Sequence, residues 1–348
     1  MSTLIVEAAD PMTSVQDAGR HGAQRYGLSP SGAMDRLSLA IANRLVGNPA
    51  ISAAIEIGPF GACFITEGES IRVAISGAAR QVSLDGRVIP VNRSMTLAPG
   101  TRLQLGPARE GVFGYLAVEH GIPGQAVFGS LSVNARAGLG SPFPRPLRAE
   151  DRLEVGAASG RREHRMGSLA PSGGPIRVVL GPQDDEFGDA VATFFETAWH
   201  VSPTSDRMGY RLEGPAIRHL HGHNIVSDGT VNGSIQVPGN GQPIVLMPDR
   251  GTTGGYPKIA TVISADLGRL AQIPAGQGFR FKAVSIAEAR TAAIAMAELI
   301  ARLPSRIMDV DDVSLDLEAL QNANLAGNAV SAVDSETWHA DGASAHGP

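Results

Sequence analysis

The sequence predicts a mainly β protein with a few helices, folded as two β-barrel-like domains. The first observation is that short, β-branched segments separated by turns fill 71–118 and much of 176–284. The second is the abundance of turn residues, with 42 glycines and 23 prolines in 348 residues. The third is that helical periodicity appears in few places, which favours closed sheets with packed helices over a doubly wound sheet.

The first half of the chain contains one clear helix and a run of strands. Residues 34–46 repeat apolar side chains at three- and four-residue spacing, which predicts a helix that ends at Gly47, before Pro49. Residues 71–118 then predict several short strands. The Asp-Gly pair at 85–86, between two apolar segments, indicates a two-residue hairpin turn.

The second half has more strands. Segment 176–181 predicts a strand, and the apolar side chains of 185–199 fall on one helical face. Further strand-like pieces are NIVSDG, GSIQVP, PIVLMP, KIATVIS and GFRFKAV. Ser285 and Glu288 form a capping-box pattern, which predicts a helix that runs to about residue 303.

These elements predict four parts along the chain. An N-terminal barrel-like domain spans 1–155, a linker of small, charged and turn residues spans 156–175, and a C-terminal barrel spans 176–303. Residues 304–348 contain one short helical pattern, DLEALQNANL, and a polar tail that we expect to be mobile.

Composition and charge argue against several classes of function. The net charge of −5 disfavours nucleic acid as a partner, since phosphate backbones require clustered positive charge. The apolar runs are too short to span a bilayer, and the N-terminus lacks the basic region of a secretion signal. A lone cysteine, Cys63, excludes an internal disulfide framework. We therefore expect a cytoplasmic protein.

The segment DRGTTGGYPK, residues 249–258, has the ingredients of an anion-binding loop. Two adjacent glycines allow backbone N–H groups to converge as a nest, and two threonines add hydroxyl donors. The lysine adds a positive charge, and it is one of only two lysines among 29 basic residues. The order of residues does not match a P-loop. A glycine-rich hairpin without a ligand is the alternative interpretation.

A second polar cluster lies in SDRMGYRLEG, where Arg207 and Arg211 are four residues apart. Two guanidinium groups are able to clamp a carboxylate in bidentate fashion. We predict that Arg207 binds a carboxylate of a substrate or of a partner. The alternatives are a structural pair with the neighbouring Asp206 and a solvated charged turn.

Two further polar groups are weaker candidates. His219, His221 and His223 alternate, so a strand would place all three on one face and suit a metal, whereas Gly222 indicates a turn. Asp17 and Asp35 lie in a glycine-rich frame near the N-terminus. They are candidates for paired acid–base carboxylates, but turn and cap roles fit them better.

Several long segments resemble one known family. The segments are TSVQDAGRHGAQRYGLSPSGAMDRLSLAIANRLVGNP, GYLAVEHGI, SDRMGYRLEG, GSIQVPGNGQPIVLMPDRGTTGGYPKIATVISADLGRLAQ and NANLAG. The chain resembles the allophanate hydrolase subunit 2 family, also called the biotin-dependent carboxyltransferase family. The resemblance implies a pair of cyclophilin-like β-barrel domains and an active cleft completed by another protein.

The family's activities suggest three functions. The first is that of the C subunit in an ATP-dependent 5-oxoprolinase, which opens a lactam to glutamate. It would act with a B subunit (also called subunit 1) and with a lactam-hydrolase A subunit, on ATP with magnesium. The second is a carboxyltransferase component that acts on urea or a related amide, with biotin supplied by a separate carrier. The third is a non-catalytic antagonist that binds a Kip-inhibitor-like partner.

The resemblance also implies site residues, because the family motifs fall on the loop and clusters described above. We expect Lys258, Asp249 and Tyr256 to be catalytic. The residues expected to bind substrate or an anion are Thr252, Thr253, Gly254, Gly255, Arg207, Gln236, Asp35 and Asn43. Four positions depart from the usual family residues, and they bear on which anion is bound and on whether catalysis occurs: His120, Leu131, Val133 and Gly251.

Overall fold

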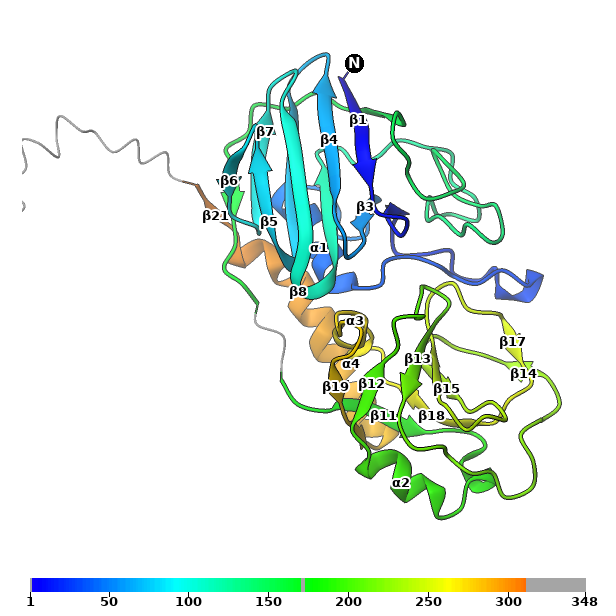
Figure 1. Ribbon diagram of the computed structural model, residues 1–348. Coiled ribbons are helices and arrows are strands. Elements are labelled where there is room, and N and C mark those ends of the chain that lie inside the picture. The colour runs from blue at the N-terminus through cyan, green and yellow to red at the C-terminus, as the bar shows by residue number, and fades with distance from the viewer. Residues whose placement is uncertain (1, 170–172, 311–348) are drawn as a thin grey trace, which may run out of the picture. The chain divides into compact units, whose positions relative to one another are not determined.

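β-Strands make up most of the architecture, which confirms the predicted fold class. The computed structural model describes residues 2–169 and 173–310, and the strands of this part form two large sheets and one separate strand pair (Figure 1). Residues 1–309 cluster into one compact unit. The helical pattern and polar tail predicted beyond residue 310 lie outside the described residues. No helix in the described part is long and apolar enough to cross a membrane.

The first sheet has 11 strands, shown mostly in blue to cyan in Figure 1. Its strands are β1 (Ser2–Ala9), β2 (Ser14–Gln16), β3 (Ala54–Ile57), β4 (Ala62–Glu67), β5 (Ile71–Leu84), β6 (Arg87–Ile89), β7 (Arg93–Leu97), β8 (Arg102–Val118), β9 (Arg152–Val155), β10 (His164–Arg165) and β21 (Met308–Asp309). The main order is β21-β10-β7-β5-β8-β4-β1-β9, with β2, β3 and β6 attached beside it. Strand β10 lies inside the stretch predicted as a linker.

Two long strands hold this sheet together. The early residues of β5 pair with β7 and its last residues pair with β6, while β8 runs beside β5 and also pairs with β3 and β4. Register shifts interrupt the β5–β8 ladder after Gly77, where a side chain would clash with the Phe113 carbonyl. The hairpin predicted at 85–86 is confirmed, because both turn residues have positive φ, as a type I′ turn requires.

The second sheet has eight strands. They are β11 (Ile176–Leu180), β12 (Trp199–Val201), β13 (Gly209–Glu213), β15 (Ser234–Gln236), β16 (Ile244–Leu246), β18 (Lys258–Val262), β19 (Gly278–Phe279) and β20 (Phe281–Ala283). Their order is β19-β12-β13-β16-β15-β18-β11-β20. The two end strands are separated in the chain only by Arg280, so the sheet closes on itself as a barrel. A separate pair joins β14 (Asp228–Gly229) to β17 (Thr253–Gly254).

Four α-helices accompany the sheets in the described part: α1 (Arg36–Leu45), α2 (Ala190–Glu196), α3 (Leu267–Ala271) and α4 (Ile286–Ala301). Short 3-10 turns are η1 (Gln24–Tyr26), η2 (Asp184–Glu186) and η3 (Leu303–Arg306). Helix α1 confirms the first predicted helix. The capping box at the start of α4 is also confirmed, because the Ser285 and Glu288 side chains each bond the other residue's backbone N–H.

The helix predicted over 185–199 is wrong in extent. Only Ala190–Glu196 is α-helical, and Trp199 belongs to β12. The apolar spacing arises because Phe187, Phe194 and Trp199 are all buried against the barrel, although three kinds of local structure supply them. Helix α3 was not predicted, since five residues are too few to show a period.

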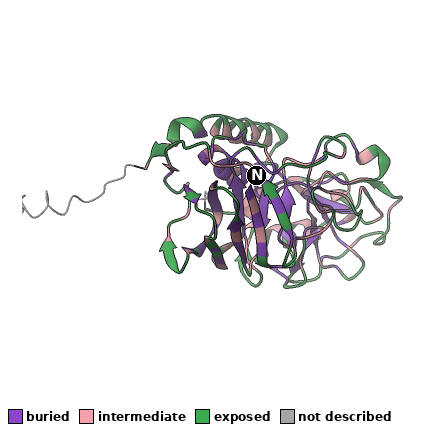
Figure 2. Ribbon diagram, turned by 90° about the horizontal axis from the view of Figure 1, so that it is seen from above, coloured by how far each residue is buried: buried purple, intermediate pink, exposed green. Residues whose placement is uncertain are grey.

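Buried side chains form two apolar clusters, and Figure 2 shows that buried positions gather on the strands. One cluster fills the first sheet. The other runs from α1 and the end of β8 into the second barrel, so one apolar core serves both sheets. Gln272 reinforces this junction. Its Oε1 accepts from the N–H groups of Val112 and Phe113, and its Nε2 donates to Asp35.

Asp266 provides a polar anchor inside the second barrel. This fully buried carboxylate accepts from the Arg177 N–H at 2.8 Å, Nε at 3.0 Å and Nη2 at 2.7 Å, and it lies 3.0 Å from Arg269 Nη1. Burial alone would raise the pKa of Asp266, but the hydrogen bonds from Arg177 outweigh it, so the pKa lies below its ordinary value.

We expect Asp266→Asn to lower the free energy of unfolding by about 1–3 kcal/mol at pH 7. Because the folded-state pKa is lowered, this stabilisation is fully present above the unfolded pKa, about 4, and is lost as the pH falls through the folded value. Urea unfolding at pH 7 and at lower pH measures the difference. The exposed Asp185→Asn is the control. An undiminished gap between wild type and Asp266→Asn at low pH would contradict the account.

Candidate functional site

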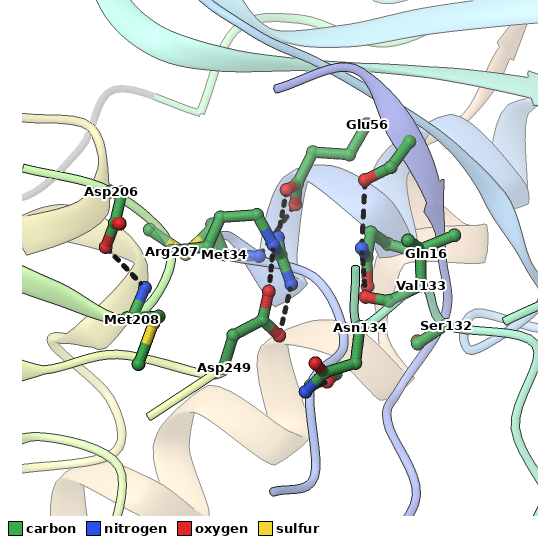
Figure 3. A network of polar contacts seen from close by, with 12 residues as sticks. Gln16, Met34, Glu56, Ser132, Val133, Asn134, Asp206, Arg207, Met208 and Asp249 are labelled. Atoms are coloured by element: carbon green, nitrogen blue, oxygen red, sulfur yellow. Dashed lines mark hydrogen bonds and ion pairs between the residues drawn. The ribbon is translucent and has the colours of Figure 1, made fainter. Parts of the chain in front are cut away.

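An arginine with two carboxylates lies where the two sheets meet. Arg207 is 8% exposed and precedes β13. Its Nε donates to Asp249 Oδ2 at 2.9 Å, and its Nη2 donates to Asp249 Oδ1 at 3.2 Å and to the Gly32 carbonyl at 2.8 Å. Its Nη1 donates to Glu56 on β3. Figure 3 shows Arg207 between the two acids.

Glu56 extends this cluster into the first sheet. It is fully buried, and its Oε2 accepts from Tyr115 Oη at 2.7 Å and from the Met34 N–H at 2.8 Å. Burial raises the pKa of Glu56, while Arg207 and Tyr115 favour the ionised carboxylate. Burial alone would lower the pKa of Arg207, but the charges of Asp249 and Glu56 outweigh it and raise the pKa above its ordinary value. The guanidinium therefore stays charged.

These contacts correct the expectation for Arg207. Its guanidinium is occupied by carboxylates of its own chain, so it is not free to bind a carboxylate of a substrate or partner. Asp206 does not hold it either, because the Asp206 carboxylate accepts from the N–H groups of Met208 and Gly209. Arg207 and Asp249 thus join the two sheets, and Glu56 is a member that the sequence did not reveal.

A second cluster surrounds Lys258, the first residue of β18. Lys258 is 2% exposed, and its Nζ lies 3.2 Å from Asp228 Oδ2. Its backbone N–H donates to Gln183 Oε1 at 3.1 Å. Gln236 on β15 is its direct neighbour in the ladder. The contact with Lys258 lowers the pKa of Asp228, which therefore keeps a negative charge beside the ammonium group.

Two donors in this cluster are unsatisfied. Gln236 Nε2 is buried and has no hydrogen-bond partner, and buried Lys258 Nζ has none besides its ion pair with Asp228. A Cβ at Gly254 would lie 2.2 Å from Gln236 Nε2, so a larger residue there would displace this amide. Buried donors without partners are costly, and an anion placed between them would satisfy both.

The loop 249–258 does not form a backbone nest. Gly254 lies in β17, and neither Gly254 nor Gly255 has positive φ, so the expectation of converging backbone N–H groups is wrong. Thr253 pairs with Gly229, and the Thr252 carbonyl accepts from the Thr230 N–H at 3.1 Å. Any anion bound at the Lys258 cluster would therefore be held by the side chains of Lys258 and Gln236, and not by a nest of backbone N–H groups. Tyr256 is 39% exposed.

Asp249 and Lys258, both expected to be catalytic, have different partners in the structure. Asp249 is paired with Arg207 at the sheet junction, whereas Lys258 is paired with Asp228. The loop thus serves two clusters, and its ends do not form one acid–base pair. Asp228 and Gln183 complete the Lys258 cluster. Both were missed, because Gln183 lies in a turn and Asp228 in the two-residue strand β14, and neither stands in a distinctive sequence pattern.

Asp35 and Asn43, both expected to bind substrate, stabilise the two ends of α1 in the structure. Asp35 caps the helix by accepting from the N–H groups of Leu37 and Ser38. The Asn43 amide donates to the Ser52 carbonyl at 2.8 Å and accepts from Asn48 at 3.1 Å.

Asp17 is not paired with Asp35. The Asp17 carboxylate accepts from Ser130 Oγ and from the Leu131 N–H, so it anchors the segment that departs from the family pattern. His120, another departure, has φ of 70°, a left-handed conformation that explains the glycine usual there in the family.

The three alternating histidines lie in a loop between β13 and β14. His219 Nε2 lies 2.9 Å from the Val237 carbonyl, and His221 Nδ1 lies 3.2 Å from Glu186. Because the segment is not a strand, the expected common face does not form. Within residues 2–169 and 173–310, no group of three or more His, Cys, Asp or Glu side chains is arranged to hold a metal ion.

We expect Arg207→Ala to lower the free energy of unfolding by about 3–5 kcal/mol, because it leaves two carboxylates without their cation at the sheet junction. Urea unfolding followed by circular dichroism measures the loss. Arg211→Ala, in the same motif but exposed, is the matched control and should change stability by less than about 0.5 kcal/mol. Equal stability of the two variants would contradict a joining role for Arg207.

Comparisons with known proteins agree with this architecture. The carboxyltransferase domain family, subdomains A and B, matches residues 26–283. The C subunit of 5-oxoprolinase from Escherichia coli (strain K12) is 41% identical over 281 residues, which cover 80% of this chain and 90% of that protein. The C subunit of 5-oxoprolinase from Haemophilus influenzae is 36% identical over 284 residues, which cover 79% of this chain and 89% of that protein. Urea amidolyase from Saccharomyces cerevisiae is 29% identical over 306 residues, which cover 80% of this chain but only 16% of that protein.

Two solved structures share the fold. The crystal structure of TTHA0988 has a TM-score of 0.73 at 33% identity, and the match covers 81% of this chain and 55% of that one. The Kluyveromyces lactis urea amidolyase has a TM-score of 0.78 at 27% identity, and the match covers 88% of this chain and 21% of that one. The chain thus spans about half of the first structure and about a fifth of the second. From its sequence and its fold, the chain belongs to the carboxyltransferase domain family.

Proposed function

We propose that the chain is the C subunit of an ATP-dependent 5-oxoprolinase, a hydrolase complex that opens 5-oxoproline to glutamate. The observation that carries this proposal is the 41% identity to the C subunit of a 5-oxoprolinase, of which the match covers 90%. Similarity along nearly the whole relative supports the same role in the same kind of complex. The complex would include a B subunit and a lactam-hydrolase A subunit, with the cytoplasm as its expected compartment.

The Lys258 cluster supports this proposal chemically. Activation of an amide by ATP creates an anionic, phosphorylated group, and carboxylation of an amide likewise creates an anion. Lys258 supplies a fixed positive charge, and Gln236 supplies a neutral donor beside it. Asp228 is half-exposed and holds the ammonium group in place. These groups would stabilise negative charge that develops during reaction without having to reorganise.

The nucleotide would supply the phosphoryl group, with magnesium, at a site shared with the partner subunits. What this chain contributes is orientation and charge around the anion. Tyr256, which is partly exposed two residues before Lys258, would contact the substrate. Asp249 acts through Arg207 and serves to position the start of the loop.

The second candidate function is a carboxyltransferase that acts on urea or a related amide. It is favoured by the description of the family and by the similarity to urea amidolyase, at a lower identity of 29%. Biotin would then be carried by a separate protein. Incubation with a carboxylated biotin carrier distinguishes the two functions, because only a carboxyltransferase discharges the carrier in the presence of urea.

We expect the purified chain alone to show no 5-oxoproline-dependent ATP hydrolysis, and the chain together with its A and B partners to show it. The reason is that the relative with the greatest identity among those described is one subunit of a 5-oxoprolinase. A coupled assay for ADP measures the rate, and omission of each partner in turn is the control. Full activity from the chain alone would contradict the need for partners.

We expect Lys258→Ala to lower kcat in the assembled complex by about tenfold or more, which corresponds to about 1.4 kcal/mol or more of transition-state stabilisation. Lys282→Ala is the matched control, since it removes the chain's other lysine, which is exposed. Circular dichroism checks that the variant folds. A fully active Lys258→Ala complex would show that the unsatisfied ammonium group has no part in the reaction.

A further inference from the structure

Arg250 is a buried cation without a counter-charge. The residue is 4% exposed, and its Nε and Nη1 are buried without hydrogen-bond partners. Three of its five N–H bonds are therefore unsatisfied. Only Nη2 is engaged, through long bonds to Gln24 Oε1 at 3.4 Å and to the Thr230 carbonyl at 3.3 Å, and both acceptors are neutral. Burial lowers the pKa of Arg250 to about 10.

Arg20, Arg72 and Arg80 also keep buried nitrogens without hydrogen-bond partners. They and Arg207 differ from Arg250 in one respect. Each feels the charge of at least one carboxylate: Arg20 that of Asp17 and Asp249, Arg72 that of Glu119, Arg80 that of Asp10, and Arg207 that of Glu56 and Asp249. Within residues 2–169 and 173–310, Arg250 is the buried arginine on which burial alone acts. Such a charge is costly unless something else neutralises it.

The surroundings of Arg250 leave room for a ligand. It lines a cavity of about 2090 Å³ that also includes Gln24, Ser31 and Asn232. Asn232 follows closely after Thr230, whose carbonyl accepts from Arg250. The Asn232 side-chain Oδ1 is buried and has no hydrogen-bond partner. The two residues thus line one cavity, and each also carries a buried polar atom without a hydrogen-bond partner.

We propose that Arg250 and Asn232 bind a small carboxylic acid that carries an amide N–H, with the carboxylate on Arg250 and the N–H on Asn232. One guanidinium charge matches one carboxylate, whereas a phosphate dianion would leave a negative charge uncompensated. The amide oxygen of Asn232 matches the N–H donor of the ligand. If the chain belongs to a 5-oxoprolinase, as proposed above, 5-oxoproline is such a molecule, since it has one carboxylate and one lactam N–H.

This site is separate in composition from the Lys258 cluster. Arg250 and Asn232 would hold unreacting groups of the substrate, whereas Lys258 and Gln236 would hold charge that develops during the reaction. Substitutions at the two sites should therefore change different measured quantities. Loss of Arg250 should weaken binding of the ligand, and loss of Lys258 should slow the reaction with little effect on binding.

Equilibrium dialysis of the full chain and of the assembled complex tests the proposal, with 5-oxoproline and N-acetylglycine as probes. Both probes carry a carboxylate and an amide N–H, but only 5-oxoproline is a substrate of the proposed enzyme. We expect both to bind to wild type, and Arg250→Gln and Asn232→Leu to weaken binding by about tenfold or more. 2-Pyrrolidinone, which lacks the carboxylate, should bind at least about tenfold more weakly than 5-oxoproline, and inorganic phosphate should not compete.

Stability gives a second readout that a merely structural arginine would not produce. Because Arg250→Gln removes an uncompensated buried charge, we expect its thermal midpoint to equal or exceed that of wild type. Added N-acetylglycine should raise the midpoint of wild type and of Lys258→Ala, but not that of Arg250→Gln. A lower midpoint for Arg250→Gln together with unchanged ligand binding would overturn the proposal and make Arg250 structural.

The outcomes separate this site from the proposed function. Binding of N-acetylglycine that depends on Arg250, in a complex that does not hydrolyse 5-oxoproline, would support the site and refute the 5-oxoprolinase assignment. Hydrolysis of 5-oxoproline with an unchanged KM in Arg250→Gln would refute the site and leave the assignment intact. Absence of binding of either probe to wild type, alone and in the complex, would also refute the site, as would competition by phosphate.

Discussion

The ion-pair cluster of Arg207, Glu56 and Asp249 is the constraint on which the rest of the structure depends. Glu56 lies on β3 of the first sheet, and Asp249 begins the loop that leads to β18 of the second. Charges in a protein interior are tolerated only when they are paired with good geometry. The cluster therefore fixes how the loop leaves the sheet junction, and everything that the loop carries is positioned from this end.

The loop from Asp249 to Lys258 then connects three environments in ten residues. Asp249 is held by Arg207, Arg250 faces the cavity, and Lys258 enters the barrel beside Gln236. The strand pair β14–β17 holds the middle of the loop. This arrangement accounts for part of the composition of the segment, because Asp249, Arg250 and Lys258 each have different neighbours and Gly254 lies next to the Gln236 amide.

The sequence predicted what depends on local physics. The helix at 34–46 follows from apolar spacing, and the turn at 85–86 follows from two residues that tolerate positive φ. Sequence analysis did not identify contacts between residues that are distant in the chain. Nothing near Lys258 in the sequence indicates Asp228 or Gln183, and Glu56 is hidden among apolar residues of a strand. The resemblance identified the right loop, but only the structure divides its residues between a joining cluster and unsatisfied donors.

The clusters at the two ends of the loop differ from the Arg207 cluster in how far their polar groups are satisfied. The Arg207 cluster is closed, since all of its nitrogens have acceptors. The groups of Lys258, Gln236, Arg250 and Asn232 are open, since each keeps a buried polar atom without a hydrogen-bond partner, although Lys258 forms an ion pair with Asp228. Such buried atoms are costly, and at functional sites binding of a ligand is one gain that offsets the cost. In the function proposed above, the two donor clusters, one at each end of the loop, bind the substrate and its reacting group.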